Sequence, residues 1–587
     1  MNREFEIPET PLAERLARLL SAKPGLLPKQ PSAVPPCGYD AVAAALRECG
    51  TTHIYGVAGR PTEEILPACF RQGIRPIGVY HQTAAVCMAL AQNYQTGRLV
   101  ATALVSAGPA ATNALTGLLV ARDNGWPVIV LGGRRSSFQA LDVVPIVRPV
   151  TKHAVSVAST SAIGACIHEA CEIAMSGRPG PVYLDLHEEA LAGNAATAPV
   201  SSARSTTPNQ RIPSVSDDGI NRVVAALLEA RRPALLLGKG VRWTVPPALL
   251  RELVDGLDLP FITSPMGRGF LPDDHPLCFN RARTVLQSHA DVVLVLGARL
   301  NWVFRYGAEL SRDARVLRVD IHRETQDDGF VQTEFLHADA GDFVTRLVSR
   351  LKSRSNELSD ASRRQRLSEW HTLLRTVSDE IQRSLDHRMN SDGRPMSPYR
   401  MMKEVRDALP GDAICVTEGN ISMLAAQAVI PACRPASRMD AGTNGCMGIA
   451  IPFAIGAKIA CPGRPVVVVV GDYGFSLSAM EMEVCVRHKI PIVVVIANNQ
   501  GNNGAIKQRS LFLSAGSERV TMFQPMLEYD RIMAMFGGQG ATVADPDQLK
   551  PALERALSAG TPVCINVVID PEMPPPHGWG VRAVERQ

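Results

Sequence analysis

The sequence predicts an α/β protein made of three consecutive doubly wound parallel-sheet domains. The chain has 587 residues, and at roughly 150 residues per domain this is too long for a single core. Short apolar runs alternate with helical patterns along most of the chain, which is typical of βαβ units and parallel sheets. Hydrophobic residues make up 46% of the chain and charged residues 20%, as expected for a globular protein with large cores.

The first domain begins after a proline-rich stretch that we interpret as an N-terminal extension. Apolar runs at residues 100–105 and 127–132 predict buried strands, and the pattern at 161–176 predicts a helix. A segment rich in Ala, Ser, Thr and Pro follows, and its composition indicates a linker.

The central and third domains repeat this alternation. Strands are predicted at 234–237, 292–296 and 316–319 in the central domain, and the strongest strand of the chain is predicted at 465–470 in the third. A charged helical pattern joins the two domains. The predicted boundaries are an N-terminal extension at 1–36, a first domain at 37–194, a linker at 195–211, a central domain at 212–351, a helical connection at 352–394, a third domain at 395–571 and a C-terminal tail at 572–587.

The composition argues against several classes of partner. The formal net charge of +4 is not gathered into a Lys/Arg block, so neither nucleic acid nor a membrane surface is an expected partner. The longest apolar-leaning stretch, 99–121, is interrupted by Gly108, Pro109 and Asn113, and we expect no membrane span. Thirteen cysteines without a Cys-x-x-Cys pair, and the lack of a signal-peptide pattern, indicate a cytoplasmic protein that binds small molecules.

The segment 466–504 carries the most informative motif. One predicted strand ends at Gly471-Asp472 and a second ends at Asn498-Asn499, so both ends are expected at one edge of a sheet. An ordinary strand–helix–strand unit, with an Asp that caps a helix and an Asn pair that makes a turn, is the alternative. Without further context this alternative is favoured. The two residues stand 27 positions apart, from residue 472 to residue 499.

The residue types of this motif fit a magnesium–diphosphate site. A hard cation takes oxygen ligands, and the carboxylate of Asp472, the amide oxygen of Asn499 and a backbone carbonyl at Gly501 supply three. Diphosphate oxygens can complete an octahedron around Mg²⁺. Backbone N–H groups of Tyr473 and Gly474, at the turn into the next helix, can reach the same phosphates.

The spacing resembles the thiamine diphosphate signature, in which Gly-Asp is followed at this interval by Asn-Asn. Four further segments extend the resemblance over nearly the whole chain, toward the family of 2-hydroxyacyl-CoA lyase and oxalyl-CoA decarboxylase, with acetohydroxyacid synthase and glyoxylate carboligase as more distant relatives. The resemblance implies a pyrimidine-binding first domain, a nucleotide-binding-like central domain and a third domain that binds thiamine diphosphate and Mg²⁺. The segments are YGVAGRPTEE from Tyr55, SAGPAATNALTG from Ser106, SPMGRGFLPDDHPL from Ser264 with GARLNW up to Trp302, and DAGTNGCMGIAIPFAIGAK from Asp440.

The resemblance also implies roles at the cofactor. Met447 stands where the family has an apolar side chain that props the cofactor into a V shape, which brings the pyrimidine amine against the thiazolium carbon. Gln82 stands where the family has an activating glutamate, and an amide can donate a hydrogen bond to the pyrimidine but cannot pass it a proton. General acid–base catalysis accelerates a step by about 10²–10⁴-fold, so glutamine in place of glutamate should slow activation of the cofactor by a factor in that range. The other expected cofactor-binding residues are Gly419, Asn420 and Gly471.

Several positions bear on the substrate. Phe138 and Gln139 resemble the lyase branch, and Asn503 stands where the decarboxylase has an active-site tyrosine, which argues against oxalyl-CoA decarboxylation. The segment 422–427 has no basic residue and resembles the synthases, so a CoA thioester substrate stays open. His81 and Asn503 are candidate pocket residues, and a structural role for His81 is the alternative.

The central domain has three residues that suit a nucleotide. By the resemblance, Lys239, Arg299 and Asp320 stand where relatives hold an adenine nucleotide, so ADP or CoA is a candidate ligand there. Lys and Arg suit phosphates, and Asp suits a ribose hydroxyl. A role for each of the three in surface salt bridges is an equal alternative.

Two hypotheses of function follow. The first is a thiamine diphosphate-dependent lyase or carboligase that makes or breaks a C–C bond beside the carbonyl of a small molecule, either by 2-hydroxyacyl cleavage or by decarboxylation of a 2-oxo acid and acyloin formation. The second is a cofactor-binding but catalytically weak regulatory or structural paralogue. In the family the cofactor lies between the first domain of one chain and the third domain of another, so we expect a homo-oligomer, a dimer of dimers, in which Gln82 and Asp472 of different chains meet.

Overall fold

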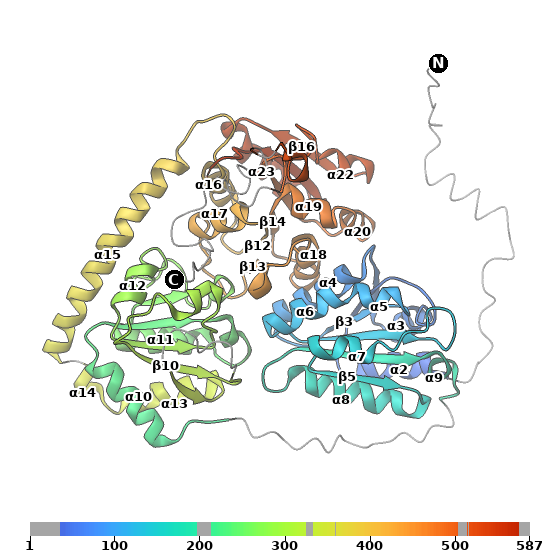
Figure 1. The fold of residues 1–587 in the computed structure, drawn as a ribbon, viewed down its shortest axis with the longest axis horizontal. Coiled ribbons are helices and arrows are strands. Elements are labelled where there is room, and N and C mark those ends of the chain that lie inside the picture. The colour runs from blue at the N-terminus through green and yellow to red at the C-terminus, as the bar shows by residue number, and fades with distance from the viewer. Residues whose placement is uncertain are drawn as a thin grey trace.

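The computed structural model describes residues 36–195, 213–323, 333–358, 360–502, 514 and 516–573. These residues form three lobes, each built around one parallel sheet with helices on its faces (Figure 1). The predicted fold class is therefore confirmed. Most of the N-terminal extension, most of the linker and most of the C-terminal tail lie outside the described residues.

The first domain contains a six-stranded parallel sheet in the order β2-β1-β3-β4-β6-β5. The strands expected at 100–105 and 127–132 are β3 and β4, and the helix expected at 161–176 is α8. The elements are α2 (Gly38–Glu48), β1 (His53–Gly56), α3 (Ile65–Arg71), β2 (Arg75–Gly78), α4 (Gln82–Thr96), β3 (Ala101–Leu104), α5 (Pro109–Asn113), α6 (Leu115–Asn124), β4 (Val128–Arg134), α7 (Val144–Val147), β5 (His153–Val157), α8 (Ile163–Met175), β6 (Pro181–His187) and α9 (Glu188–Ala192).

The central domain contains a five-stranded parallel sheet in the order β11-β10-β9-β7-β8. The three strands expected in this domain are β7, β9 and β10. The elements are α10 (Asp217–Glu229), β7 (Pro233–Leu237), α11 (Pro247–Leu257), β8 (Phe261–Thr263), α12 (Arg283–His289), β9 (Val292–Leu296), β10 (Arg315–Asp320), β11 (Thr333–His337) and α13 (Ala340–Lys352).

The third domain contains a six-stranded parallel sheet in the order β13-β12-β14-β15-β17-β16. Its central strands β14 and β15 consist almost entirely of buried apolar residues, as parallel strands covered on both faces require. The elements are α16 (Pro398–Ala408), β12 (Ile414–Thr417), α17 (Ile421–Val429), β13 (Arg438–Asp440), α18 (Ala450–Ala460), β14 (Val466–Gly471), α19 (Asp472–Ser478), α20 (Glu481–Arg487), β15 (Val493–Asn498), α22 (Arg531–Met535), β16 (Gln539–Val543), α23 (Pro546–Ser558) and β17 (Val563–Val568).

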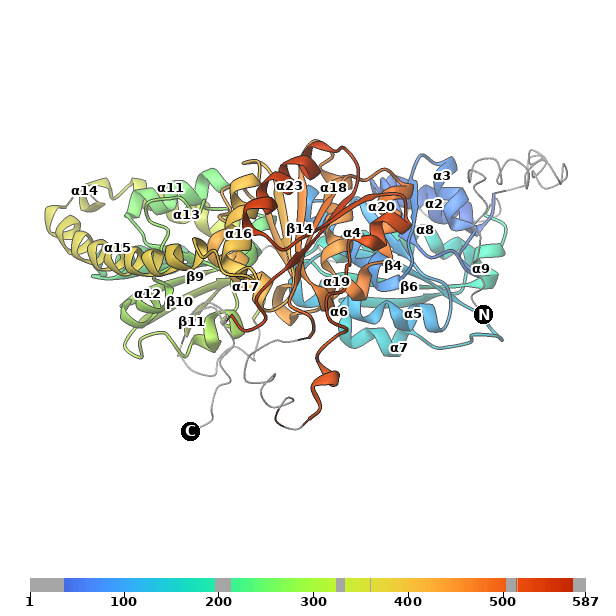
Figure 2. The same cartoon turned by 90° about the horizontal axis from the view of Figure 1, so that it is seen from above.

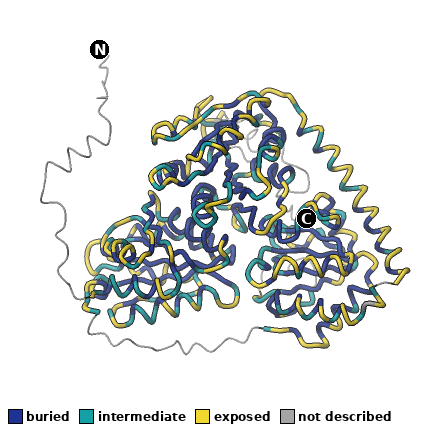
Figure 3. Tube along the Cα trace, turned by 180° about the vertical axis from the view of Figure 1, so that it is seen from behind, coloured by how far each residue is buried: buried dark blue, intermediate teal, exposed yellow. Residues whose placement is uncertain are grey.

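A long helix, α15 (Ala361–Met389), follows the short α14 (Ser355–Leu358) and connects the central and third domains. It runs along the edge of the molecule, and Figure 3 shows much of its surface exposed. One side packs on the central domain, where Trp370 Nε1 donates to the carbonyl of Pro233 at 3.1 Å. The expected helical connection is thus mainly one continuous helix. None of the helices in the described ranges is long and apolar enough to cross a membrane.

The first and third domains share one hydrophobic core. Helix α4 of the first domain packs along α18 of the third, and Figure 2 shows the two domains side by side from above. A Cβ at Gly456 would lie 2.1 Å from the carbonyl oxygen of Met88, so only glycine allows this close approach. The rings of Trp126 and Phe453 add an aromatic contact, with centroids 5.4 Å apart. The third domain is therefore packed closely against the first through α18.

Candidate functional site

The ends of β14 and β15 bring the two halves of the motif together. The strands are parallel neighbours, with Gly471 in register with Ala497. Asp472 begins α19 with only 1% of its surface exposed. Its Oδ1 accepts the N–H of Tyr473 at 2.8 Å, and its Oδ2 accepts the N–H of Gly501 at 2.8 Å. The carboxylate is thus fixed by the loops that follow both strands.

Three groups that carry oxygen converge at this point. The side-chain amide of Asn499 lies 2.9 Å from the carbonyl oxygen of Gly501 and 3.1 Å from Asp472 Oδ1. With its nitrogen turned inward, the amide donates to both oxygens. With its oxygen turned inward, three oxygens face one another, an arrangement that a cation between them would stabilise.

Burial raises the pKa of the Asp472 carboxyl to about 6, against the opposing effect of backbone hydrogen bonds, the first of them from Gly501. A buried carboxylate favours its neutral form unless a positive charge lies beside it. A divalent cation at the three oxygens would therefore favour the ionised form of Asp472. The donor set fits Mg²⁺.

The other residues expected at the cofactor lie on loops at the same edge of the sheet. Tyr473 and Gly474 form the first turn of α19. Gly419, with φ of +93°, and Asn420 lie between β12 and α17. Met447 is half-buried in the loop before α18. Because β13, β12 and β14 are adjacent parallel strands, the loops that follow them lie at one edge of the sheet.

Gln82 is the first residue of α4, in the first domain. Its Oε1 accepts a hydrogen bond from Asn113 Nδ2 at 3.0 Å. The N–H groups on Nε2 of the same amide take no part in this bond. His81 is the N-cap of the same helix, and its Nδ1 accepts the N–H of Thr83 at 3.1 Å. The sequence analysis named Asn113 only as an interruption of an apolar stretch and did not predict this contact.

Two buried glutamates were also missed by the sequence analysis. Glu418 directly follows β12, at the same sheet edge as Asp472. Glu481 begins α20, and its carboxylate accepts the backbone N–H of His81 at 2.9 Å and of Tyr80 at 3.2 Å. The signal for Glu418 is its place one residue after a buried strand, whereas the partners of Glu481 are some 400 positions away in the sequence.

Three residues are expected to bear on substrate specificity, and the structure describes two of them, Phe138 and Gln139. Phe138 is 71% exposed, and the guanidinium of Arg135 lies 5.9 Å from its ring centroid. Gln139 has a φ of +63° and packs against Gly108. A Cβ added at Gly108 would lie 2.9 Å from the Cβ of Gln139. Asn503 lies outside the described residues.

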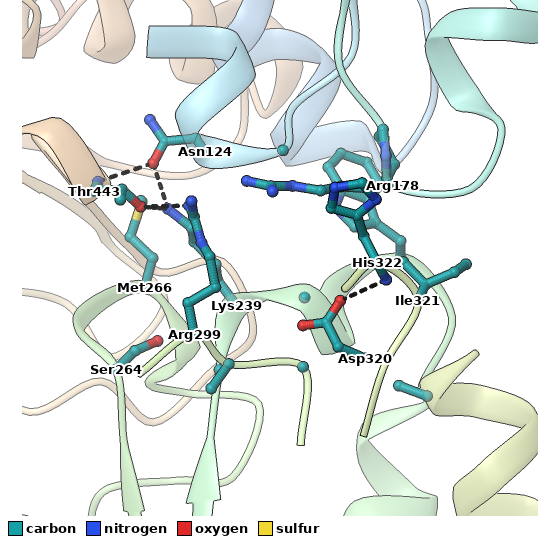
Figure 4. Close-up of a pocket in the computed structure, with 18 of the residues that line it drawn as sticks. Asn124, Arg178, Lys239, Ser264, Met266, Arg299, Asp320, Ile321, His322 and Thr443 are labelled. Carbon is teal, nitrogen blue, oxygen red and sulfur yellow. Dashed lines mark hydrogen bonds between the residues drawn. The ribbon is translucent and has the colours of Figure 1, made fainter. Parts of the chain in front are cut away.

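A cavity lies where the three domains meet (Figure 4), lined among others by Lys239, Arg299 and Asp320. Lys239 Nζ donates to Asn124 Oδ1 and, at 2.9 Å, to Thr443 Oγ1. Arg299 Nη2 donates to the same Thr443 Oγ1 at 3.0 Å. These two cations therefore lie between domains, toward one end of the cavity.

The other end of this cavity holds an acidic group. Asp320 accepts the backbone N–H of His322 at 3.0 Å, and burial raises the pKa of its carboxyl. Arg178 of the first domain also lines the cavity (Figure 4). Burial, together with the charge of Arg299, lowers the pKa of Lys239 well below its ordinary value. An anion near these cations would offset that effect.

Comparison with known families identifies this architecture. Three domain models match in chain order: the N-terminal TPP binding domain of thiamine pyrophosphate enzymes at residues 37–160, their central domain at 220–347 and their C-terminal TPP binding domain at 418–567. The chain belongs to the thiamine pyrophosphate enzymes. Thiamine pyrophosphate is the same compound as thiamine diphosphate. All three parts of the thiamine pyrophosphate enzyme are present, so the family resemblance is confirmed.

Similar proteins cover nearly the whole chain. A 2-hydroxyacyl-CoA lyase from Oryza sativa subsp. japonica is 31% identical over 92% of this chain and 96% of its own. An oxalyl-CoA decarboxylase from Escherichia coli (strain K12) is 31% identical over 91% and 95%. An acetolactate synthase large subunit from Mycobacterium tuberculosis is 28% identical over 91% and 96%. This thiamine pyrophosphate enzyme is thus similar to lyases, decarboxylases and synthases, and it is an enzyme of the C–C lyase or carboligase type.

The buried Glu481 predicts a pH-dependent stability. Burial raises the pKa of its carboxyl to about 7, with the backbone hydrogen bond from Tyr80 as the first opposing effect, so the folded protein binds this proton more tightly than the unfolded chain. The contribution of Glu481 to stability is complete below the unfolded pKa of about 4.3 and is lost as the pH rises toward 7. Glu481→Gln keeps an acceptor oxygen and does not titrate.

We expect the unfolding temperature of Glu481→Gln, relative to the native chain, to rise between about pH 5 and about pH 8, measured without added cofactor. Glu229→Gln, at an exposed glutamate at the end of α10 in the central domain, is the control for loss of a carboxylate. If the difference in unfolding temperature between Glu481→Gln and the native chain stays constant or falls as the pH rises, the pKa of the Glu481 carboxyl is not raised in the folded protein.

Proposed function

We propose that this enzyme binds thiamine diphosphate through Mg²⁺ held by Asp472, Asn499 and the carbonyl of Gly501, and that it makes or breaks a C–C bond beside a carbonyl. The side-chain amide of Asn499 lies within 3.1 Å of both the Gly501 carbonyl oxygen and Asp472 Oδ1, at the ends of two paired strands, and this is the observation that supports the metal site. The bound cofactor supplies a nucleophilic carbon and an electron sink.

We propose that the loops at the sheet edge orient the cofactor. Backbone N–H groups of Tyr473 and Gly474 would bind the diphosphate, and the Tyr473 N–H would do so by giving up its bond to Asp472 Oδ1. Gly419 and Asn420 line the same edge. Met447 holds the two rings in a bent arrangement. These roles are supported by the three loops that meet at this edge.

Gln82 contacts the pyrimidine in this proposal. Asn113 donates to its Oε1, so the Gln82 amide N–H groups are left to donate to a pyrimidine nitrogen. An amide there orients the ring but transfers no proton. The first step should therefore be slower than it would be with a glutamate.

We propose a small carbonyl compound as the substrate, either a 2-hydroxyacyl compound that is cleaved or a 2-oxo acid that is decarboxylated and joined to an acceptor. The names of the similar proteins support both classes. His81 and Asn503 are the proposed pocket residues. The backbone N–H of Thr83 donates to His81 Nδ1 at the start of α4, so a structural role for His81 as the cap of this helix is the alternative.

We propose that the three-domain cavity holds the phosphates of ADP or CoA. Lys239 and Arg299 line one end, and Asp320 at the other end suits a ribose hydroxyl. The position of all three residues in a cavity between domains favours this role over surface salt bridges.

We also propose a dimer of dimers. Tyr80, Leu477 and Met480 are large apolar residues with 49%, 53% and 46% of their surfaces exposed, and they lie near the start of α4 and around α19, where a second chain would complete the cofactor site. Thirteen free cysteines support a reducing, cytoplasmic location.

Product release from a set of candidate substrates tests the function. With thiamine diphosphate and Mg²⁺ present, we expect carbon dioxide or an aldehyde from at least one 2-oxo acid or 2-hydroxyacyl-CoA thioester. Asp472→Ala and treatment with a metal chelator should both remove this turnover, because each destroys the cation site. Binding of the cofactor without turnover of either class would favour the second hypothesis, a regulatory or structural paralogue, for which Gln82 is the main support.

Exchange of the thiazolium proton tests the placement of Gln82. We expect Gln82→Glu to accelerate this exchange by about 10²–10⁴-fold, because the carboxyl group can share a proton with the pyrimidine. Gln72→Glu, on the surface of the same domain, is the matched control and should leave the rate unchanged. If Gln82→Glu exchanges at the native rate, Gln82 does not contact the pyrimidine.

A further inference from the structure

Glu418 holds the loop that carries Met447. Its side chain is fully buried, with 0% of its surface exposed. Its Oε1 accepts the N–H of Gly448 at 2.7 Å, and its Oε2 accepts the N–H of Ile449 at 2.8 Å and of Ala450 at 2.7 Å. One carboxylate therefore fixes three consecutive backbone groups that directly follow Met447.

Ala450 is the first residue of α18, Ile449 is its N-cap and Gly448 precedes them. The first N–H groups of a helix have no acceptors within the helix. A negative charge at this end also interacts favourably with the helix dipole. A buried carboxylate is tolerated when it accepts several hydrogen bonds. An amide in its place has a single acceptor oxygen and would turn a donor toward one of the three N–H groups.

The same carboxylate contacts the turn after β14. A Cβ at Gly474 would lie 2.2 Å from Glu418 Oε1, so the turn that follows Asp472 packs directly on the Glu418 side chain. Gly448, with φ of +81°, packs against α19 from the other loop, since a Cβ there would lie 2.9 Å from Leu477 Cβ. Glu418 thus lies between the loop of Met447 and the turn at Asp472.

We propose that Glu418 is a positioning residue that sets Met447 relative to the turn at Asp472 and thereby sets the bend of the bound cofactor. This inference rests on the proposed function for its last step. The first step, that Glu418 holds residues 448–450, concerns the protein alone. The two steps can be tested separately.

Hydrogen–deuterium exchange of the cofactor-free protein tests the first step. We expect Glu418→Gln to speed exchange at Gly448, Ile449 and Ala450 by about 10- to 100-fold, because a buried donor loses its acceptor. Glu404→Gln, which removes a buried carboxylate from α16 of the same domain, is the control and should leave these amides protected. If Glu418→Gln does not fold, Glu418→Asp, whose carboxylate is one methylene shorter, should show the same faster exchange. Unchanged protection in the measured variant overturns the proposal.

Cofactor measurements test the second step. We expect Glu418→Gln to bind thiamine diphosphate with Mg²⁺ about 10- to 100-fold more weakly than Glu404→Gln does, and to exchange the thiazolium proton more slowly even at saturation. Glu418→Asp is measured in its place if Glu418→Gln does not fold. A purely structural role would restore the native rate at saturation, and that result would overturn the second step. If the native protein itself binds no thiamine diphosphate, the proposed function fails, while the hydrogen-exchange result still decides the first step.

Discussion

The parallel pairing of β14 with β15 is the constraint on which the candidate site depends. Both strands run through the middle of the third sheet and are buried on both faces, so a shift in their register would displace many packed side chains. Their common carboxyl edge brings Asp472 to the loop that contains Asn499 and Gly501. Residues 472 and 499 are 27 positions apart in the sequence, but the side chain of Asn499 lies 3.1 Å from Asp472 Oδ1.

Contacts with the other two domains hold this edge in place. The close approach of α4 and α18 at Gly456 fixes the first domain against the third. At Thr443, close to the loop of Met447, the central domain contributes hydrogen bonds from Lys239 and Arg299. The loop that contains Thr443 and Met447 therefore contacts both the central domain and, through Asn124, the first domain.

Much of the fold and part of the site could be predicted from the sequence. Continuous apolar runs such as 465–470 predict buried parallel strands, because both faces of such a sheet are covered. The Gly-Asp and Asn-Asn pairs could be recognised as a candidate cation site because their oxygen ligands lie in short local motifs. Contacts between distant segments left no such signal: Asn113 with Gln82, Glu481 with His81 and Glu418 with Gly448 depend on how helices and strands pack. Lys239 and Arg299 were recognised as cations, but their place between domains was not predicted.

The most direct measurement is a calorimetric titration of the protein with thiamine diphosphate, with and without Mg²⁺. If Asp472, Asn499 and Gly501 hold the cation that binds the diphosphate, we predict saturable binding with Mg²⁺ that is lost when a chelator removes the metal. Binding of equal strength without a divalent cation, or no binding under either condition, would contradict a magnesium–diphosphate site at the ends of β14 and β15.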